Sequence, residues 1–512
     1  MKAKYPVSFL YLYVLVTGAS VMALELAASR FLAPYYGTST VVWANIIGLV
    51  LLSLSLGYWV GGKLADRWPD GRLLMTISLA SGALTSLLPL WGALIFPLLS
   101  AGILNTPAWI VICSFFAVLI VFAPPVFLLA MVSPFAIRLV ADEDEAVNVG
   151  KVAGNLYAFS TLGSLIGTFG TALLTIPFLG SRETIFLWSA ALIAISAWGL
   201  RHTRRWWLAL LLALPLVVYV LTNGQSAATD GERIVWQKDT LYQHVRVIRN
   251  EAGDTYLVYN EGGGVQSVRR HNDALHEDDY YDDYLLLPFL TENPRQMLVL
   301  GSAGGTIPRL VSKYIKPLYP DLRITGVEID PDVVKIGPRF FGVQPDDADI
   351  VIQDARVFVS STDHRYDIVI VDCYSNEVYI PFHLSTVEFF RTVRDRLTEN
   401  GIIALNVNAT SPDSRLLASM AKTVREAFDY TYLVKVRGPY NYMLIGAKHP
   451  LDLERLKRID AASPLEQIRR EWPEHWEPLG KGQPAGALLL TDNRAPTEML
   501  TDTMIFSMAR QQ

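Results

Sequence analysis

Glycine-rich and acidic residues in the second half of the chain are spaced as a nucleoside-binding site would need them. Gly301 opens a glycine-rich turn after a short apolar run, and Glu328, Asp354 and Asp372 each follow an apolar run of their own. Such a turn lets a ligand approach the backbone, and an acidic residue ending the next strand can accept both ribose hydroxyls. Glu328 comes 27 residues after Gly301, within the range for such a unit. The alternative is that the acidic residues only cap the helices that follow.

The apolar runs themselves predict the strands that would position these residues. Short apolar runs with helical stretches between them are typical of a buried parallel sheet, doubly wound, with ligands bound beyond the carboxyl ends of its strands. Before this sheet, β-rich runs at 242–248 and 255–260 predict a small antiparallel β domain, and 272–292 reads as a helix with an acidic start. The five predicted strands are 296–300, 323–327, 350–353, 367–371 and 401–407.

The first half of the chain has the composition of a membrane domain. The whole chain is 51% hydrophobic and 18% charged, against about 25% charged residues in an ordinary soluble domain. No charged residue occurs between Leu73 and Ile137, and a helical span needs about 20 apolar residues. An additional span within 73–137 is an alternative, because prolines interrupt this stretch. We predict seven spans, at 7–29, 41–62, 73–97, 108–137, 152–176, 184–200 and 206–222.

Charge distribution bears on location and partners. Ten Lys and Arg residues fall in one set of predicted loops and only Arg30 and Arg182 in the other, which predicts that the first set is cytoplasmic. With seven spans the C-terminal region would then lie outside, and with an even number it would lie in the cytoplasm. We expect a multi-pass protein of the cell membrane with the lipid bilayer as a partner. The net charge of −5 argues against a nucleic-acid partner, and the two cysteines exclude a multi-cysteine metal site, so no metal is predicted.

Residues 235–500 resemble the spermidine synthases (polyamine aminopropyltransferases), in the membrane-fused branch with an N-terminal multi-span domain. Val327-Glu328-Ile329-Asp330 is similar to the ribose motif of the family, and Asp372 falls at its catalytic aspartate. Further matches are Leu241-Tyr242-Gln243 at the tyrosine–glutamine motif, Gln266 at the end of the next strand, Tyr280-Tyr281-Asp282 with Pro288, Asp354-Ala355 at the adenine, Pro381 beside it, and the segment Leu490 to Pro496.

The resemblance implies a fold and a division of the chain. The expected fold is a polytopic α-helical membrane domain, then a small β domain, then an α/β Rossmann-like domain of the S-adenosylmethionine methyltransferase type. The corresponding ranges are 1–222 for the transmembrane domain, 223–272 for the linker and β domain, and 273–512 for the catalytic domain. A homo-oligomer is implied only because soluble members of the family self-associate.

The resemblance also implies an activity. An aminopropyl group would pass from decarboxylated S-adenosylmethionine, a co-substrate rather than a tightly bound cofactor, to a small cationic amine such as putrescine, and methylthioadenosine would leave. Asp372 would orient the amine and accept its proton. The residues implied for binding the donor are Gln243, Gln266, Tyr281, Gly301, Gly304, Gly305, Glu328, Asp354, Ala355 and Pro381, and those implied for the acceptor are Tyr280, Asp282, Ser375 and Tyr440.

The departures from the family pattern lie on the amine side. Gly304 stands where the family has an aspartate, Ser375 replaces a second aspartate, and Tyr281 replaces a histidine or glutamine. An acidic stretch could hold the distal ammonium of a polyamine instead, or it could be a solvated helix start that the helix dipole favours. This stretch contains Asp273, Glu277, Asp278, Asp279, Asp282 and Asp283.

Two other functions remain open on the sequence alone. In the first, an S-adenosylmethionine-dependent methyl- or alkyltransferase uses the same sheet; loss of the loop aspartate at Gly304 would remove a repulsion, and Arg309 nearby would meet the carboxylate of the donor. In the second, the protein is a non-catalytic ligand sensor or transporter, for which Glu25 and Arg30, near the end of the first span, are the main ionisable candidates. Cys373, beside Asp372, is expected to pack rather than react.

Overall fold

The structure, a computed structural model, describes residues 5–36, 40–100, 107–142, 149–222, 232–260, 264–275, 279–375, 378–480 and 486–509. The chain forms two compact units. One consists of Met1–Ala227 with Lys238–Gln243, and the other consists of Ala228–Gln237 with His244–Gln512.

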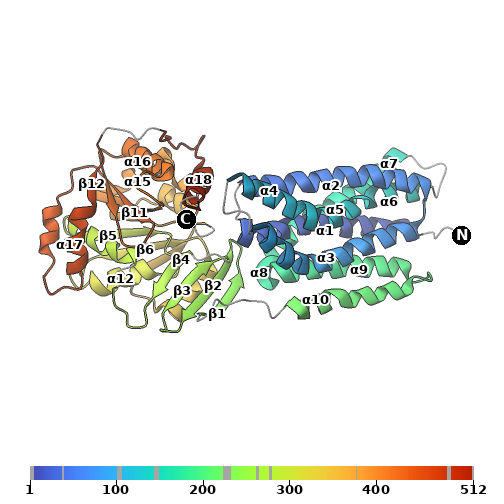
Figure 1. The fold of residues 1–512 in the computed structure, drawn as a ribbon, viewed down its shortest axis with the longest axis horizontal. Helices are drawn as coiled ribbons and strands as arrows, with labels where there is room; N and C mark the ends of the chain where they lie inside the picture. The colour runs from blue at the N-terminus through green and yellow to red at the C-terminus, as the bar shows by residue number, and fades with distance from the viewer. Residues whose placement is uncertain are drawn as a thin grey trace. The chain divides into compact units, whose positions relative to one another are not determined.

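The first unit is a bundle of apolar helices, in which α1, α2, α3 and α9 run alongside one another (Figure 1). Among the described residues, six helical stretches are long and apolar enough to cross a membrane. The helices are α1 (Val7–Tyr36), α2 (Thr40–Arg67), α3 (Gly71–Ser100), α4 (Pro107–Ala117), α5 (Ala123–Ala130), α6 (Val132–Ala141), α7 (Val149–Gly170), α8 (Ile176–Leu179), α9 (Ser181–Leu200) and α10 (Leu214–Thr222), with π-helical turns η2 (Val118–Phe122) and η3 (Thr171–Thr175) and the 3₁₀-helix η4 (Trp206–Ala213).

Six of the seven predicted spans coincide with these long stretches. The described residues of 73–137 belong to two of these stretches. Pro89 and Pro97 lie inside α3 without ending it. The described part of 73–137 therefore shows no additional span. The seventh prediction falls on the shorter pair η4 and α10. Its 3₁₀ portion rises about 2.0 Å per residue rather than about 1.5 Å, which lengthens its reach. The number of crossings stays a prediction.

Two glycines of the fifth stretch lie in close contact with the backbone of α1. A Cβ atom added at Gly163 would lie 2.0 Å from the carbonyl oxygen of Leu15, and one added at Gly167 would lie 2.1 Å from that of Ala19. Both partners belong to α1, so α1 and α7 approach each other as only small residues permit.

The second unit begins with a small antiparallel sheet in the order β1-β2-β3-β4. The two predicted β-rich runs form its central strands, and a strand on either side completes it. Apolar side chains from this sheet, such as Val247 and Leu257, pack with Phe341 in one buried cluster. The strands are β1 (Glu232–Asp239), β2 (His244–Asn250), β3 (Thr255–Tyr259) and β4 (Val265–Arg269).

The helix predicted at 272–292 is shorter than expected. The described helical residues begin at Tyr280, as the 3₁₀-helix η5 (Tyr280–Leu286) followed by α11 (Leu287–Leu290). Asp273 has a φ of 56°, in the left-handed region, so a right-handed helix cannot start there. The prediction of a helix from residue 272 is therefore wrong, although 276–278 lie outside the described residues.

The large sheet has eight strands in the order β12-β10-β11-β9-β8-β5-β6-β7. All five predicted runs form strands of its parallel part, and the antiparallel strands β10 to β12 extend one side. The order reverses between β5 and β8, the point where open α/β sheets bind ligands. The strands are β5 (Gln296–Leu300), β6 (Arg323–Glu328), β7 (Asp349–Ile352), β8 (Tyr366–Val371), β9 (Leu397–Asn408), β10 (Tyr430–Lys435), β11 (Asn441–Ala447) and β12 (Trp476–Pro478).

Helices cover both faces of this sheet, which makes the domain Rossmann-like. Alternate residues of β5 face opposite cores, so Met297 packs with one cluster and Leu298 with the other. The first cluster includes residues of α12 and α17, and the second includes residues of α14, α15, α16 and α18. The remaining helices are α12 (Thr306–Tyr314), α13 (Pro331–Ile336), η6 (Gly337–Phe341), α14 (Ala355–Ser361), η7 (Phe382–Leu384), α15 (Val387–Asp395), α16 (Arg415–Ala427), η8 (Leu453–Arg458), α17 (Glu466–His475) and α18 (Thr497–Ala509).

Candidate active site

The glycine-rich turn after β5 brings three strand ends together. Gly301 has a φ of 81°, and a Cβ atom there would lie 2.2 Å from the carbonyl oxygen of Asp372, so only glycine fits. The backbone N–H groups of Gly301 and Ser302 both donate to the carbonyl oxygen of Val327, each at 3.0 Å. Gly305, with a φ of 87°, ends the turn as the N-cap of α12. The turn thus joins the ends of β5, β6 and β8.

Glu328 ends β6 beside this turn and is held by the backbone. Its two carboxylate oxygens accept hydrogen bonds from the N–H groups of Ala303, at 2.8 Å, and Asp330, at 3.1 Å. The side chain is buried, and burial raises the pKa of its carboxyl group to about 6. Each carboxylate oxygen keeps a further lone pair, so the group can still accept a hydrogen bond from a ligand.

Asp354 has the helix-capping geometry that was the alternative for these acidic residues. Its Oδ1 accepts from the N–H of Val357 at 3.0 Å, which makes it the N-cap of α14, and its Oδ2 lies 3.2 Å from His383 Nε2. Ala355 follows it as the buried first residue of α14, and Pro381 directly precedes η7. A cavity of about 500 Å³ lies at this edge and is lined by Asp354, Arg356, Val357, Ser360, Ser361 and His383.

Asp372 follows β8 and is held by two side chains. Tyr280 donates its hydroxyl to Oδ2 at 2.9 Å, and Asn406 donates its amide Nδ2 to Oδ1 at 3.1 Å. Burial raises the pKa of the Asp372 carboxyl group to about 6, although both hydrogen bonds act in the opposite direction. The result is a carboxylate whose proton affinity lies closer to neutrality than that of a free aspartate.

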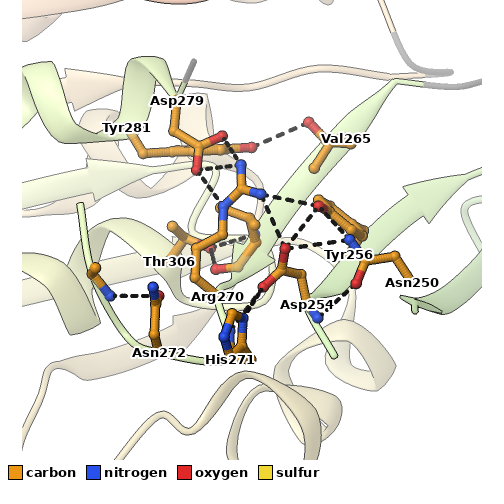
Figure 2. A network of polar contacts seen from close by, with 12 residues as sticks. Asn250, Asp254, Tyr256, Val265, Arg270, His271, Asn272, Asp279, Tyr281 and Thr306 are labelled. Atoms are coloured by element: carbon orange, nitrogen blue, oxygen red, sulfur yellow. Dashed lines mark hydrogen bonds and ion pairs between the residues drawn. The ribbon is translucent and has the colours of Figure 1, made fainter. Parts of the chain in front are cut away.

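Tyr280, which holds Asp372, packs against a second tyrosine, Tyr281. The rings of Tyr280 and Tyr281 lie 4.1 Å apart between centroids, and Tyr281 donates its hydroxyl to the carbonyl oxygen of Val265 at 3.1 Å. Figure 2 shows this second contact, which ties η5 to β4. Burial raises the pKa of both phenols well above 10, so they remain neutral hydrogen-bond donors.

The acidic stretch before these tyrosines is engaged with the protein itself. Arg270 forms a bidentate pair with Asp279, at 2.9 and 2.8 Å, and also reaches Asp254 at 3.3 Å (Figure 2). Asp273 pairs with Arg309. These partners favour the structural reading of the stretch over the binding of an ammonium group. Asp283 accepts from Trp472 Nε1, Asp282 is 3% exposed, and Glu277 and Asp278 lie outside the described residues.

The remaining predicted residues have local contacts of their own. Ser375 pairs its backbone with Tyr379, and Tyr440 is 40% exposed with its carbonyl oxygen accepting from Ala409 N–H. Gln266 lies on β4 and donates its amide to Gly264 O at 3.4 Å. Gln243 is buried but groups with the first unit, so the structure does not place it relative to Asp372.

Gly304 is packed so tightly that no side chain fits there without movement. Its N–H donates to Ser267 Oγ at 2.8 Å. A Cβ atom at Gly304 would lie 2.9 Å from a ring carbon of Phe341 and 3.1 Å from Cβ of Ser267. These two side chains take the space that an acidic side chain at this position would need.

Sequence reasoning missed the amides on the other side of Asp372. Asn406 and Asn408 lie at the end of β9, and Asn441 on β11 donates to the side-chain oxygens of both. Tyr374 donates its hydroxyl to Asn406 O and accepts from Asn408 N–H, both at 3.0 Å. The only signal in the sequence was that Asn406 and Asn408, with one residue between them, lie at the end of the predicted strand 401–407.

Comparison with known proteins agrees with this geometry. Residues 285–446 match the spermine/spermidine synthase domain family. A probable polyamine aminopropyl transferase of Bifidobacterium longum is 29% identical over 56% of this chain and 67% of its own length. Polyamine aminopropyltransferase 2 of Aquifex aeolicus is 24% identical over 92% of this chain and 94% of its own length. The crystal structure of a probable spermidine synthase from Corynebacterium glutamicum covers 49% of this chain and 89% of its own, with a TM-score of 0.37 and 20% identity.

The match at 285–446 contains the glycine-rich turn, Glu328, Asp354 and Asp372. The similarity to the Aquifex protein extends over the apolar helices as well, consistent with an N-terminal region fused to the enzyme domain. Residues 285–446 are therefore similar to a spermine/spermidine synthase domain, and the Bifidobacterium and Aquifex relatives are named as polyamine aminopropyltransferases, a class of alkyl-group transferases.

Proposed function

We propose that this chain transfers the aminopropyl group of decarboxylated S-adenosylmethionine to an amine such as putrescine. The observation that carries the proposal is the Asp372 carboxylate, held by Tyr280 and Asn406 beside the Gly301 turn at the switch point of the sheet. A proton acceptor in that place is what the attack of an amine on a sulfonium donor requires.

The donor would lie across the carboxyl ends of β5, β6 and β7. The lone pairs of Glu328 that its backbone partners leave unused would accept the ribose hydroxyls, since a carboxylate has about four acceptor positions. The turn from Gly301 to Gly305 would let the nucleoside approach the backbone, and the cavity lined by Asp354 and His383 would take the adenine. Ala355 and Pro381 flank the same edge.

The reaction would proceed with balanced electrons and protons. The amine nitrogen attacks the propyl carbon attached to sulfur, the new C–N bond forms, and the electron pair of the broken C–S bond goes to sulfur as methylthioadenosine leaves. Alkyl amines have pKa values near 10 and are bound as ammonium ions, so one proton must leave the nitrogen before its lone pair can attack. Asp372 would accept that proton, and Tyr280 would hold the carboxylate in place. Fixing donor and amine in line would supply a large part of the rate.

The methyltransferase alternative has less support. It would use Arg309 to meet the carboxylate of intact S-adenosylmethionine, but Arg309 is buried and paired with Asp273. A sensor or transporter would need no proton acceptor at Asp372. The same assay separates these functions from aminopropyl transfer.

We further propose that the apolar helices embed the protein in a membrane with the enzyme domain in the cytoplasm. Six stretches have the required length and composition, and the sulfonium donor is made in the cytosol. Reporter domains fused at 202–205 and after Thr222 test this proposal. Thr222 O accepts from Arg182 at the start of α9, whereas 202–205 follow the end of that helix, so opposite signals are expected, with the cytoplasmic one after Thr222. An external signal after Thr222 would overturn it.

Product analysis by mass spectrometry tests the activity. Full-length protein in detergent receives decarboxylated S-adenosylmethionine and a panel of diamines and polyamines. We expect methylthioadenosine and an aminopropylated amine from the unchanged protein, and a loss of about 10²- to 10⁴-fold for Asp372→Asn. Asp363→Asn is the matched control, because Asp363 is fully exposed. Donor binding without product would favour the alternatives, and neither binding nor product would overturn the enzyme proposal.

A further inference from the structure

The amide of Asn406 is fixed in direction by a second amide behind it. Asn441 lies opposite Asn408 in the register of β11 with β9. Its Nδ2 donates to Asn406 Oδ1 at 3.1 Å and to Asn408 Oδ1 at 2.8 Å. Because an NH₂ group can only donate, the oxygen of Asn406 must face Asn441, and the NH₂ of Asn406 is left to face Asp372.

The backbone around these amides is held in turn. Lys435 Nζ donates to three carbonyl oxygens of the loop before Asn441: those of Val436 at 3.3 Å, Gly438 at 2.7 Å and Asn441 itself at 3.0 Å. On the other strand, Tyr374 bridges the carbonyl of Asn406 and the N–H of Asn408. Both ends of the amide chain are therefore anchored independently of any ligand.

We propose that Asn441 is a positioning residue, which acts through Asn406 to hold the Asp372 carboxylate as an oriented proton acceptor for the attacking amine. The inference rests on the proposed function and deepens it. With the Asn406 amide turned around, its carbonyl oxygen would face Oδ1 of Asp372 and oppose the ionised form. With the amide as observed, Oδ1 is occupied by Asn406 and Oδ2 by Tyr280, so the lone pairs that remain are fixed in direction.

Four tyrosines and Cys373 around Asp372 stay neutral in the assay range. Burial and the charge of Asp372 raise the pKa values of these five groups. The neutral groups are Tyr280, Tyr281, Tyr284, Tyr374 and Cys373.

A pair of charge-matched variants tests the direction of the amide chain. In Asn441→Asp the new carboxylate accepts rather than donates, so Asn406 must turn its NH₂ away from Asp372. In Asn408→Asp the new carboxylate still accepts from Asn441, and the chain to Asp372 is kept. Both variants add one negative charge within the same cluster. We expect the acid limb of the kcat profile to move up by about one pH unit more in Asn441→Asp than in Asn408→Asp, with the KM for the donor unchanged.

The proposal would be overturned if the acid limb of the kcat profile lay at the same pH in Asn441→Asp and Asn408→Asp. A second measurement does not depend on transfer activity: the pH above which the stabilisation by Asp372→Asn stops increasing, compared in the Asn441→Asp and Asn408→Asp backgrounds. This pH follows the folded-state pKa of Asp372 and should be higher by about one unit in the Asn441→Asp background. If the unchanged protein transfers nothing but this pH still moves, the proposed function fails while the positioning role stands.

Discussion

The donor side and the amine side of this site are built in different ways. On the donor side, Glu328 is held by backbone N–H groups from the turn that follows β5 and from its own strand end. On the amine side, Asp372 is held by the side chains of Tyr280 and Asn406, which come from η5 and β9. A site held by the backbone changes only when the fold changes. A site held by side chains can be retuned one residue at a time.

The difference predicts first a pH-dependent stability effect at Asp372, the largest in free energy. Its folded pKa of about 6 exceeds the usual value near 4. Its favourable contribution is therefore complete below about pH 4 and is lost as pH rises through 6. The free energy of unfolding of Asp372→Asn, relative to that of the unchanged protein, should therefore rise by up to about 3 kcal/mol between pH 4 and pH 7. Thermal melts of the detergent-solubilised protein across this range measure the gain, and parallel curves for the two proteins would contradict it.

Glu328→Gln tests the donor side alone. The amide presents an NH₂ where an oxygen now accepts a backbone N–H, so the ribose contacts and the turn are both disturbed. We expect kcat/KM for the donor to fall about 10- to 100-fold, mainly through KM, while KM for the amine changes little. Initial rates at varied donor and amine concentrations separate the two constants. A fall confined to the amine constant would show that the two sides are not divided as described.

Tyr280→Phe tests the amine side with a smaller change. It removes one hydroxyl that favours the ionised form of Asp372. Turnover should fall about tenfold near pH 7, and the acid limb should move to higher pH, because the carboxyl pKa rises when a donor is lost. The KM for the donor is the internal control. If the acid limb of the pH profile did not move, the Tyr280 hydroxyl would not affect the pKa of Asp372, and its ring would contribute only packing.

Asp279→Asn should give the smallest effect. It tests whether the acidic stretch stabilises the fold or binds the polyamine. Loss of the bidentate pair with Arg270 should lower the free energy of unfolding by about 1 kcal/mol. The KM for putrescine or a longer polyamine should stay within about twofold, because the pair is engaged inside the protein. Asp363→Asn, an exposed site, should leave both quantities unchanged. A large rise in the KM for the polyamine would show instead that the acidic stretch binds the substrate.

Sequence reasoning succeeded where chemistry is local to one strand and its turn. Gly301, Glu328 and Asp372 each follow an apolar run, and the parallel sheet brings those runs to one edge. It failed at Asn406 and Asn441, because their contact depends on the antiparallel register of β11 with β9. The periodicity of short apolar strands does not specify such a register.

Two other differences have local physical causes. The helix expected from residue 272 cannot begin before the left-handed Asp273 is passed, and aspartate is among the residues that tolerate this conformation. The acidic stretch could not be assigned from the sequence, since the arginines that pair with it, Arg270 and Arg309, lie on either side of it in the chain.

The packing at Gly304 also constrains how this chain can evolve. Gly304→Asp alone would press Cβ against Ser267 and Phe341. Trimming Ser267 first would remove the hydroxyl that now accepts the Gly304 N–H and leave that buried donor unpaired. Either substitution made first, at Gly304 or at Ser267, would thus destabilise the protein by itself. Selection for a different amine would find an easier path through the tyrosines and asparagines around Asp372 than through the loop.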